Sequence, residues 1–94
     1  MFARVSLLQG SPEQLAKAIG IPILPEVQQM RGFKGAYALL DRKNGKGILM
    51  TLWDTEEAMQ ASAERAKQIR GQIATDAGAK SPPVVETYEV IGQP

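Results

Sequence analysis

The sequence predicts one α+β domain, in which four strands form an antiparallel sheet and helices cover one of its faces. Apolar strand-like runs and helix-start signals alternate in the order strand, helix, strand, strand, helix, strand. An Asn44-Gly45 pair lies between the two central runs and is typical of the turn of a hairpin. Because 94 residues suffice for a single hydrophobic core, residues 1–94 are expected to form one domain.

The charge balance and two missing residue types limit the chemistry open to the chain. It has 11 Lys and Arg residues against 10 Asp and Glu residues, a net charge of +1, so neither nucleic acid nor an anionic membrane is an expected partner. Cysteine and histidine are both absent. Disulfides, thiolate metal sites, imidazole catalysis and haem ligation by histidine are therefore excluded, and no metal or cofactor is expected.

The sequence lacks the pattern of a targeting signal or a membrane span. Arg4 lies inside the first apolar stretch instead of ahead of it, and the polar residues 9–11 follow too soon for a signal peptide. No apolar run approaches the roughly 18 residues that a membrane-spanning helix needs. We therefore expect a cytoplasmic protein.

The first part of the chain is predicted to form a strand followed by an interrupted helical region. Residues 2–9 are rich in Val, Leu and Phe, which favours a strand. Ser11 as N-cap, with a proline directly after it, predicts a helix over 12–19. Further prolines remove backbone donors, so we expect a kinked connection and then a second helical piece over 25–30. The alternative is one loop over 20–31.

The middle of the chain is predicted to form a hairpin followed by a helix. Residues 33–42 and 46–53 are strand-like, and the Asn-Gly pair between them favours a type I′ turn. Asp54 or Thr55 is the expected cap of the next helix. One face of that helix carries residues at spacings of three and four, namely Met59, Ser62, Ala66, Ile69 and Ile73.

The last part of the chain is predicted to end that helix and add a fourth strand. Gly78 is a typical C-cap, and the prolines at 82 and 83 favour an extended lead-in to a strand over 84–91. The complete order is that of the split βαβ, or ferredoxin-like, fold, with two helices on one face of an antiparallel sheet.

Both faces of the predicted hairpin are apolar. If Asn44-Gly45 is a two-residue loop, Leu40 pairs with Leu49 and Tyr37 pairs with Leu52. One face then carries Tyr37, Leu39, Ile48, Met50 and Leu52. The opposite face carries Ala36, Ala38, Leu40, Leu49, Thr51 and Trp53. A ferredoxin-like subunit covers only one side of its sheet, so one of these faces needs another cover.

The second apolar face predicts a homodimer. At about 25 cal/mol per Å², half a dozen such side chains left in water would forgo several kcal/mol, which is comparable with the whole stability of a small domain. We therefore expect two copies to pack through their sheet faces. The alternatives are a ligand cavity on one side of the sheet, or a monomer with an unusually apolar exposed sheet.

Three stretches carry a family resemblance: residues 32–35 (GFKG), 52–58 (LWDTEEA) and 85–90 (VETYEV). They resemble the antibiotic-biosynthesis-monooxygenase-like proteins of the dimeric α+β barrel superfamily, and the resemblance covers nearly the whole chain. It implies a ferredoxin-like subunit whose sheet closes a barrel with that of a second subunit. Some members are cofactor-independent oxygenases of quinol-like polyketides, others degrade haem, and many have no assigned activity.

The residues on which the haem-degrading members depend are not kept. Aligned from Trp53, their helix Trp corresponds to Ser62, their helix His falls near Gln72, and their strand Asn falls around Arg4. Other relatives have a His at the position of Ser62. The resemblance therefore implies neither haem degradation nor His-assisted quinol oxidation for this chain.

Five residues are candidates for a ligand site: Trp53, Ser62, Tyr37, Tyr88 and Arg4. By the resemblance, Trp53 borders a pocket between sheet and helices; otherwise it fills the core at the strand–helix junction. Ser62 either bonds a ligand or lets the helix approach the sheet. Tyr37 and Tyr88 either orient a phenolic ligand or lie at the dimer seam. Arg4 either stabilises a ligand anion or, if the two side chains face the same side of the sheet, pairs with Glu86 on a neighbouring strand.

Two functions fit this sequence. The first is a dimeric α+β barrel protein that binds a small aromatic or apolar molecule between sheet and helices and, as an enzyme, oxygenates it without a cofactor. The second is a non-catalytic homodimeric binding or stress-response module. An enclosed cavity of roughly a few hundred Å³, lined by Tyr or Trp, would favour the first.

Overall fold

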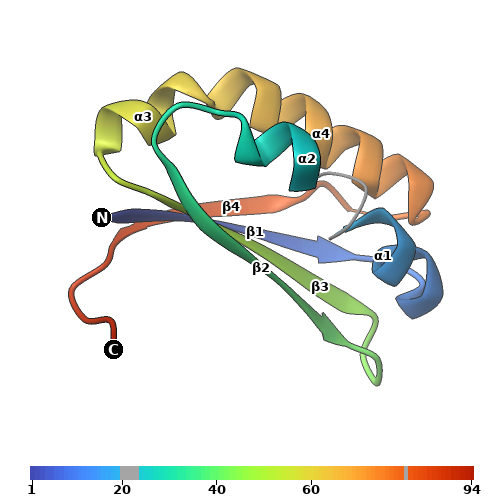
Figure 1. Ribbon diagram of the computed structural model, residues 1–94. Helices are drawn as coiled ribbons and strands as arrows, with labels where there is room; N and C mark the ends of the chain where they lie inside the picture. The colour runs from blue at the N-terminus through green and yellow to red at the C-terminus, as the bar shows by residue number, and fades with distance from the viewer. Residues whose placement is uncertain (20–23, 80) are drawn as a thin grey trace.

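Four antiparallel strands form the sheet of this protein, and helices lie on one of its faces (Figure 1). The computed structural model describes residues 1–19, 24–79 and 81–94. The elements are β1 (Phe2–Gln9), α1 (Pro12–Ala18), α2 (Leu24–Gln28), β2 (Phe33–Asp41), β3 (Lys46–Trp53), α3 (Glu56–Ala61), α4 (Ala63–Asp76) and β4 (Val84–Glu89). The strand order is β2-β3-β1-β4. The predicted ferredoxin-like α+β fold is therefore confirmed.

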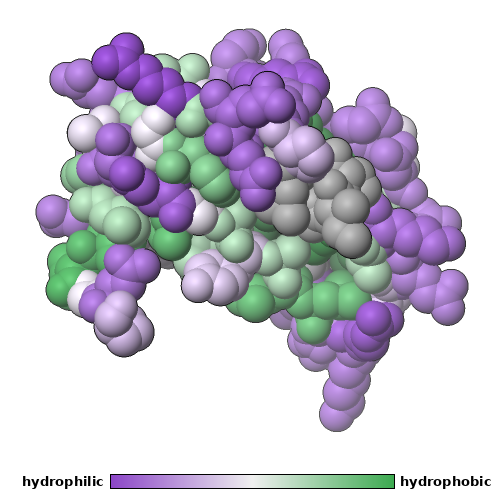
Figure 2. Space-filling view, viewed as in Figure 1, coloured by the Kyte–Doolittle hydropathy of each residue, from purple (hydrophilic) through white to green (hydrophobic). Residues whose placement is uncertain are grey.

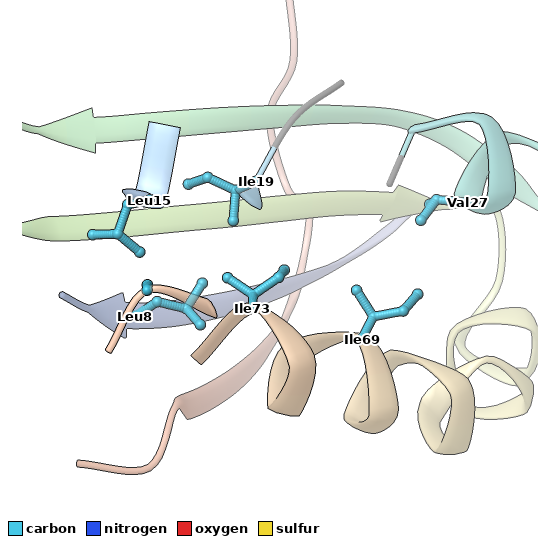
Figure 3. Packing of buried hydrophobic residues seen from close by; sticks show 7 residues of the cluster. Leu8, Leu15, Ile19, Val27, Ile69 and Ile73 are labelled. Carbon is cyan, nitrogen blue, oxygen red and sulfur yellow. The ribbon is translucent and has the colours of Figure 1, made fainter. Parts of the chain in front are cut away.

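The hydrophobic core lies between the sheet and the helices. Alternation along β1 directs Arg4, Ser6 and Leu8 toward the helices. The apolar cluster joins side chains of β1, α1, α2 and α4, and six of them face one another in Figure 3: Leu8, Leu15, Ile19, Val27, Ile69 and Ile73. Close packing of α1 on β3 depends on Gly47, where a Cβ would lie 3.0 Å from Ile19.

The predicted hairpin forms, but its register differs by two residues from that of a two-residue turn. Leu40 lies opposite Gly47 and Tyr37 opposite Met50, and the loop is residues 42–45. The Asp41 carboxylate causes the difference, because it accepts hydrogen bonds from the backbone N–H of Asn44 and from its side-chain amide. No described residue other than glycine has a positive φ, so the type I′ turn is wrong. A two-residue shift keeps each side chain on its predicted face.

The predicted helices form with two differences. The piece expected over 25–30 is α2, so the single-loop alternative is wrong; the predicted connection at 20–23 lies outside the described residues. The long helix after β3 is divided at Ser62 into α3 and α4, and Thr55 caps α3 by accepting the N–H of Ala58. Gly78 follows α4 with a φ of 67°, as expected at a C-cap. None of the described helices is long and apolar enough to cross a membrane.

The face of the sheet opposite the helices exposes large apolar side chains. Pairing places Tyr37 and Leu39 on this face of β2, and Val84 and Tyr88 on the same face of β4. These four side chains are 48 to 60 % exposed. Figure 2 shows hydrophobic surface in the lower part of the view, where β2 and β3 lie in Figure 1. We call this the open face. Its apolar character confirms that both sides of the sheet are hydrophobic.

The hairpin loop provides a stability test. Gly45 has a φ of 66°, and a Cβ there would lie 2.5 Å from the carbonyl oxygen of Gly10. We expect Gly45→Ala to lower the free energy of unfolding by about 1–3 kcal/mol. Gly71 in α4 is the matched control, because a Cβ there would meet nothing within 4 Å. Gly71→Ala should raise the free energy of unfolding by about 0.5–1 kcal/mol. Urea unfolding at equal protein concentration measures both, and equal effects would contradict the assigned loop geometry.

Candidate functional site

Buried polar side chains gather at one end of the space between sheet and helices. They come from β1, β3 and the junction of α3 with α4: Arg4, Ser6, Thr51 and Ser62. Most of the apolar cluster lies toward the other end, beside α1 and the end of α4, and its members Val27 and Ile69 extend to the polar region. Because buried polar groups cost free energy unless they are hydrogen-bonded, their concentration in one region marks it as a candidate site.

Arg4 connects the sheet to the helical layer. Its side chain points from β1 toward the α3–α4 junction and is only 5 % exposed. The Nη1 group donates to Ser62 Oγ at 2.9 Å, and the Nη2 group donates to the carbonyl oxygen of Met59. Ser62 Oγ donates to the same carbonyl at 2.7 Å. Two side chains thus satisfy the backbone carbonyl where α3 ends.

Trp53 forms an aromatic wall beside Arg4. The centre of the Arg4 guanidinium lies 5.8 Å from the Trp53 ring centroid, which is a cation–π distance. Phe33 meets the same ring edge-on, with centroids 5.9 Å apart. The indole Nε1 donates to Thr51 Oγ1 at 2.9 Å. The ring is therefore fixed on two sides, and Trp53 is at once part of the core and part of the site.

A small cavity lies between the sheet and the helices at this point. Its wall consists of Arg4, Ser6, Val27, Met30, Leu49, Thr51, Trp53, Ala66, Ile69 and Arg70. The cavity volume of about 20 Å³ has room for one or two water molecules. This is far below the roughly 300 Å³ or more of a usual small-molecule pocket. This cavity is therefore much smaller than the enclosed void of a few hundred Å³ expected for the first function.

Arg70 reaches the cavity from α4. Its Nη1 atom is buried and has no hydrogen-bond partner among residues 1–19, 24–79 and 81–94. Neither Arg70 nor Arg4 forms a salt bridge with any acid in the described part of the chain. Burial lowers the pKa of Arg4, and the positive charge of Arg70 lowers it further. Burial likewise lowers the pKa of Arg70.

The structure brings only some of the sequence-predicted residues together. Arg4 and Trp53 line the cavity, whereas Ser62 lies behind Arg4 and positions it. Tyr37 and Tyr88 lie on the open face, away from the cavity, where the dimer seam is expected. A hydrogen bond to the Glu86 side chain raises the pKa of Tyr88.

The predicted pairing of Arg4 with Glu86 is wrong. Arg4 lies opposite Thr87 in the sheet, and Glu86 lies opposite Val5. Because side chains alternate along a strand, Arg4 faces the helices and Glu86 faces the open side.

Sequence reasoning missed Arg70, Ser6 and Thr51. Arg70 is adjacent in sequence to Ile69 on the inward stripe of the helix and lies four residues after Ala66. A basic residue beside an apolar helical stripe was the available signal, but whether its side chain turns inward depends on packing.

In the described part of the chain, no cluster of acidic side chains is arranged to hold a metal ion.

The chain is similar in sequence to an uncharacterised protein of Mycobacterium tuberculosis H37Rv, Rv2557. The two are 33 % identical over 93 residues, which is 96 % of this chain and 41 % of that protein. The chain therefore spans less than half the length of this curated relative. No protein-family model matches the sequence.

Solved structures share the whole arrangement of strands and helices. A monooxygenase from Streptomyces coelicolor, ActVA-Orf6 in complex with nanaomycin D, superposes with a TM-score of 0.78 at 16 % identity, over 98 % of this chain and 88 % of that chain. A protein of Deinococcus radiodurans, provisionally assigned as an antibiotic biosynthesis monooxygenase, gives a TM-score of 0.75 at 17 % identity, over 99 % and 95 %. This chain has the antibiotic biosynthesis monooxygenase fold. Within that fold, its cavity lies on the helix-covered side of the sheet.

The contact between Arg4 and Ser62 is open to a double-mutant test. Ser62→Ala leaves the buried Nη1 of Arg4 without an acceptor, so we expect the free energy of unfolding to fall by about 1–3 kcal/mol. In an Arg4→Met background the same substitution should cost less, with a coupling of about 0.5 kcal/mol or more. Ser81→Ala, at an exposed serine, is the control and should change stability by less than about 0.5 kcal/mol. Strict additivity in thermal unfolding would contradict the contact.

Proposed function

We propose that this chain forms a homodimer of the monooxygenase fold that binds a small aromatic molecule beside Trp53 and oxidises it with O₂ without a cofactor. The observation that carries the proposal is the combination of a fixed indole ring and buried polar groups around a cavity in an otherwise apolar interior. A purely structural core would fill this position with aliphatic side chains, because buried polar and charged groups cost stability. ActVA-Orf6, a monooxygenase that binds nanaomycin D, supports a small-molecule ligand and its oxidation by analogy of fold.

A ligand enters by displacing the roof of the cavity. Val27 and Met30, which belong to α2 and the turn after it, form that roof. A methionine side chain adapts readily to a new shape, and α2 has only five residues. Its ion pair to α4, between Glu26 and Arg65, is exposed on both sides and therefore contributes little stability. A larger molecule therefore binds only if the Val27 and Met30 side chains move away from the sheet.

Hydroquinones and anthrones suit such a site because they can transfer electrons to oxygen once deprotonated. In an anthrone, the methylene carbon loses two hydrogen atoms and gains one oxygen atom from O₂ to become a carbonyl, and the second oxygen atom leaves as water. The protein's part is to exclude bulk water and to orient the ring against Trp53. None of the described residues that line the cavity is an acid or a histidine, so this wall offers no carboxylate or imidazole base for the ligand proton.

Dimerisation explains the open face. Tyr37 and Leu39 at one side of the sheet, with Val84 and Tyr88 at the other, leave a broad apolar surface that extends across the strands. Surfaces of this kind on small proteins usually mark an interface. A second copy of the chain supplies a matching surface of the same composition, as a two-fold interface requires.

The dimer is tested by placing a charge on the open face. We expect Leu39→Glu to convert the dimer to a folded monomer, because the side chain is 48 % exposed on the open face and lies outside the hydrophobic core. Ala61→Glu places the same charge on an exposed position of α3, on the helical side, and should leave the dimer intact. Sedimentation velocity at micromolar concentration distinguishes monomer from dimer for both variants. A wild-type protein that sediments as a monomer would refute the dimer.

Ligand binding and turnover are tested separately. Trp53 is the sole tryptophan, so its emission should be quenched by 1,4-naphthohydroquinone and anthrone under nitrogen. In air, an oxygen electrode should record consumption that falls by about tenfold in Trp53→Phe and is unchanged in Tyr88→Phe, which lies outside the cavity. Quenching without oxygen consumption would identify the non-catalytic binding module instead. Absence of quenching by either compound would refute the site.

A further inference from the structure

Two guanidinium groups face the same cavity without an acid to balance them. Arg4 and Arg70 both line it, and neither has a salt-bridge partner among the residues that the structure describes. The other wall residues are aromatic, aliphatic or hydroxyl-bearing. With Arg4 and Arg70 as its only charged side chains among the described residues, this wall creates a positive potential beside low-dielectric surroundings. The cavity is therefore electrostatically suited to a negatively charged occupant.

The two arginines have different roles. Both terminal nitrogens of Arg4 already donate to protein oxygens, one to Ser62 and one to Met59. The Nη1 atom of Arg70 is also buried but donates to no acceptor in the described part of the chain. Native structures rarely leave a buried charged donor unpaired, and those that do usually have a functional reason. Arg70 is the group that remains free to hold a ligand.

We propose that the cavity takes the anionic form of an aromatic ligand, with its oxygen anion bound by Nη1 of Arg70 and its ring beside Trp53. This deepens the proposed function and depends on it. Carboxylates and phenolates share the required chemistry, an anionic oxygen attached to a ring, and each accepts charge-assisted hydrogen bonds from a guanidinium. Arg4 is a positioning residue: it holds Trp53 from one face and adds to the positive potential.

Electrostatic considerations support this assignment. Burial lowers the pKa of Arg70, and burial together with the charge of Arg70 lowers the pKa of Arg4. A guanidinium nevertheless stays protonated in proteins at neutral pH, so the like charges persist in the empty cavity. Binding of an anion removes both the repulsion and the unpaired donor. Shifts of this kind, caused by burial and a like charge in one cavity, are typical of functional sites.

The test compares two nearly isosteric probes, 2-naphthoate and its neutral amide, 2-naphthamide, by isothermal titration calorimetry. We expect wild-type protein to bind the carboxylate at least about tenfold more tightly than the amide. Arg70→Gln should abolish this preference and leave the affinity for 2-naphthamide within about twofold. Lys67→Gln removes the same charge from an exposed position of α4 and should preserve the preference for the carboxylate.

Two further measurements show whether Arg70→Gln loses binding for a reason other than loss of folding. Arg70→Gln removes an unpaired buried charge, so its thermal stability should equal or exceed that of the wild type, which separates lost binding from lost folding. In ¹H–¹⁵N spectra, 2-naphthoate should shift the Nε–H resonance of Arg70 and not that of Arg65, which lies on the surface in its ion pair. Equal affinity for acid and amide would overturn the anion site and leave the aromatic site standing. Binding of neither would overturn both.

Discussion

The guanidinium group of Arg4 holds the first strand to the helical layer, and the geometry of the site depends on it. It satisfies the Met59 carbonyl where α3 ends and binds the Ser62 hydroxyl, which in turn donates to the same carbonyl. These bonds fix where the helix is interrupted and hence where α4 begins. The start of α4 sets the rotation of the whole helix, which places Ile69 in the core and Arg70 at the cavity.

The interior is divided by chemistry as well as by position. Toward α1, aliphatic side chains pack as in any small domain and supply most of the favourable burial. Toward α3, four polar side chains are buried and two positive charges share one cavity. The free energy of unfolding of a domain of 94 residues is small. A group of buried polar side chains that lowers this free energy is therefore expected where those side chains bind a ligand.

Local sequence signals predicted the strands and helix ends but not the site. Residues 2–9 and 46–53 match β1 and β3 because hydrophobic runs and a nearby turn determine them. The helix break at Ser62 could not be predicted, since its cause is Arg4, 58 residues earlier in the chain. The hairpin register likewise depends on the side chain of Asp41, which competes with the Asn-Gly preference. The first feature is decided by a contact between distant segments, and the second by a local side-chain contact that overrides the usual turn preference.

The same strands that form the cavity wall also form the open face. In β1, Arg4 and Ser6 face the helices, while Val5 and Leu7 face the other way. In the proposed dimer, a partner that packs against Val5 and Leu7 holds the backbone on both sides of Ser6. The positions of the cavity groups would then be fixed partly by the second subunit, although it contributes no residue to the cavity. Ligand affinity and subunit association are therefore expected to be thermodynamically linked, because each favours the same strand geometry.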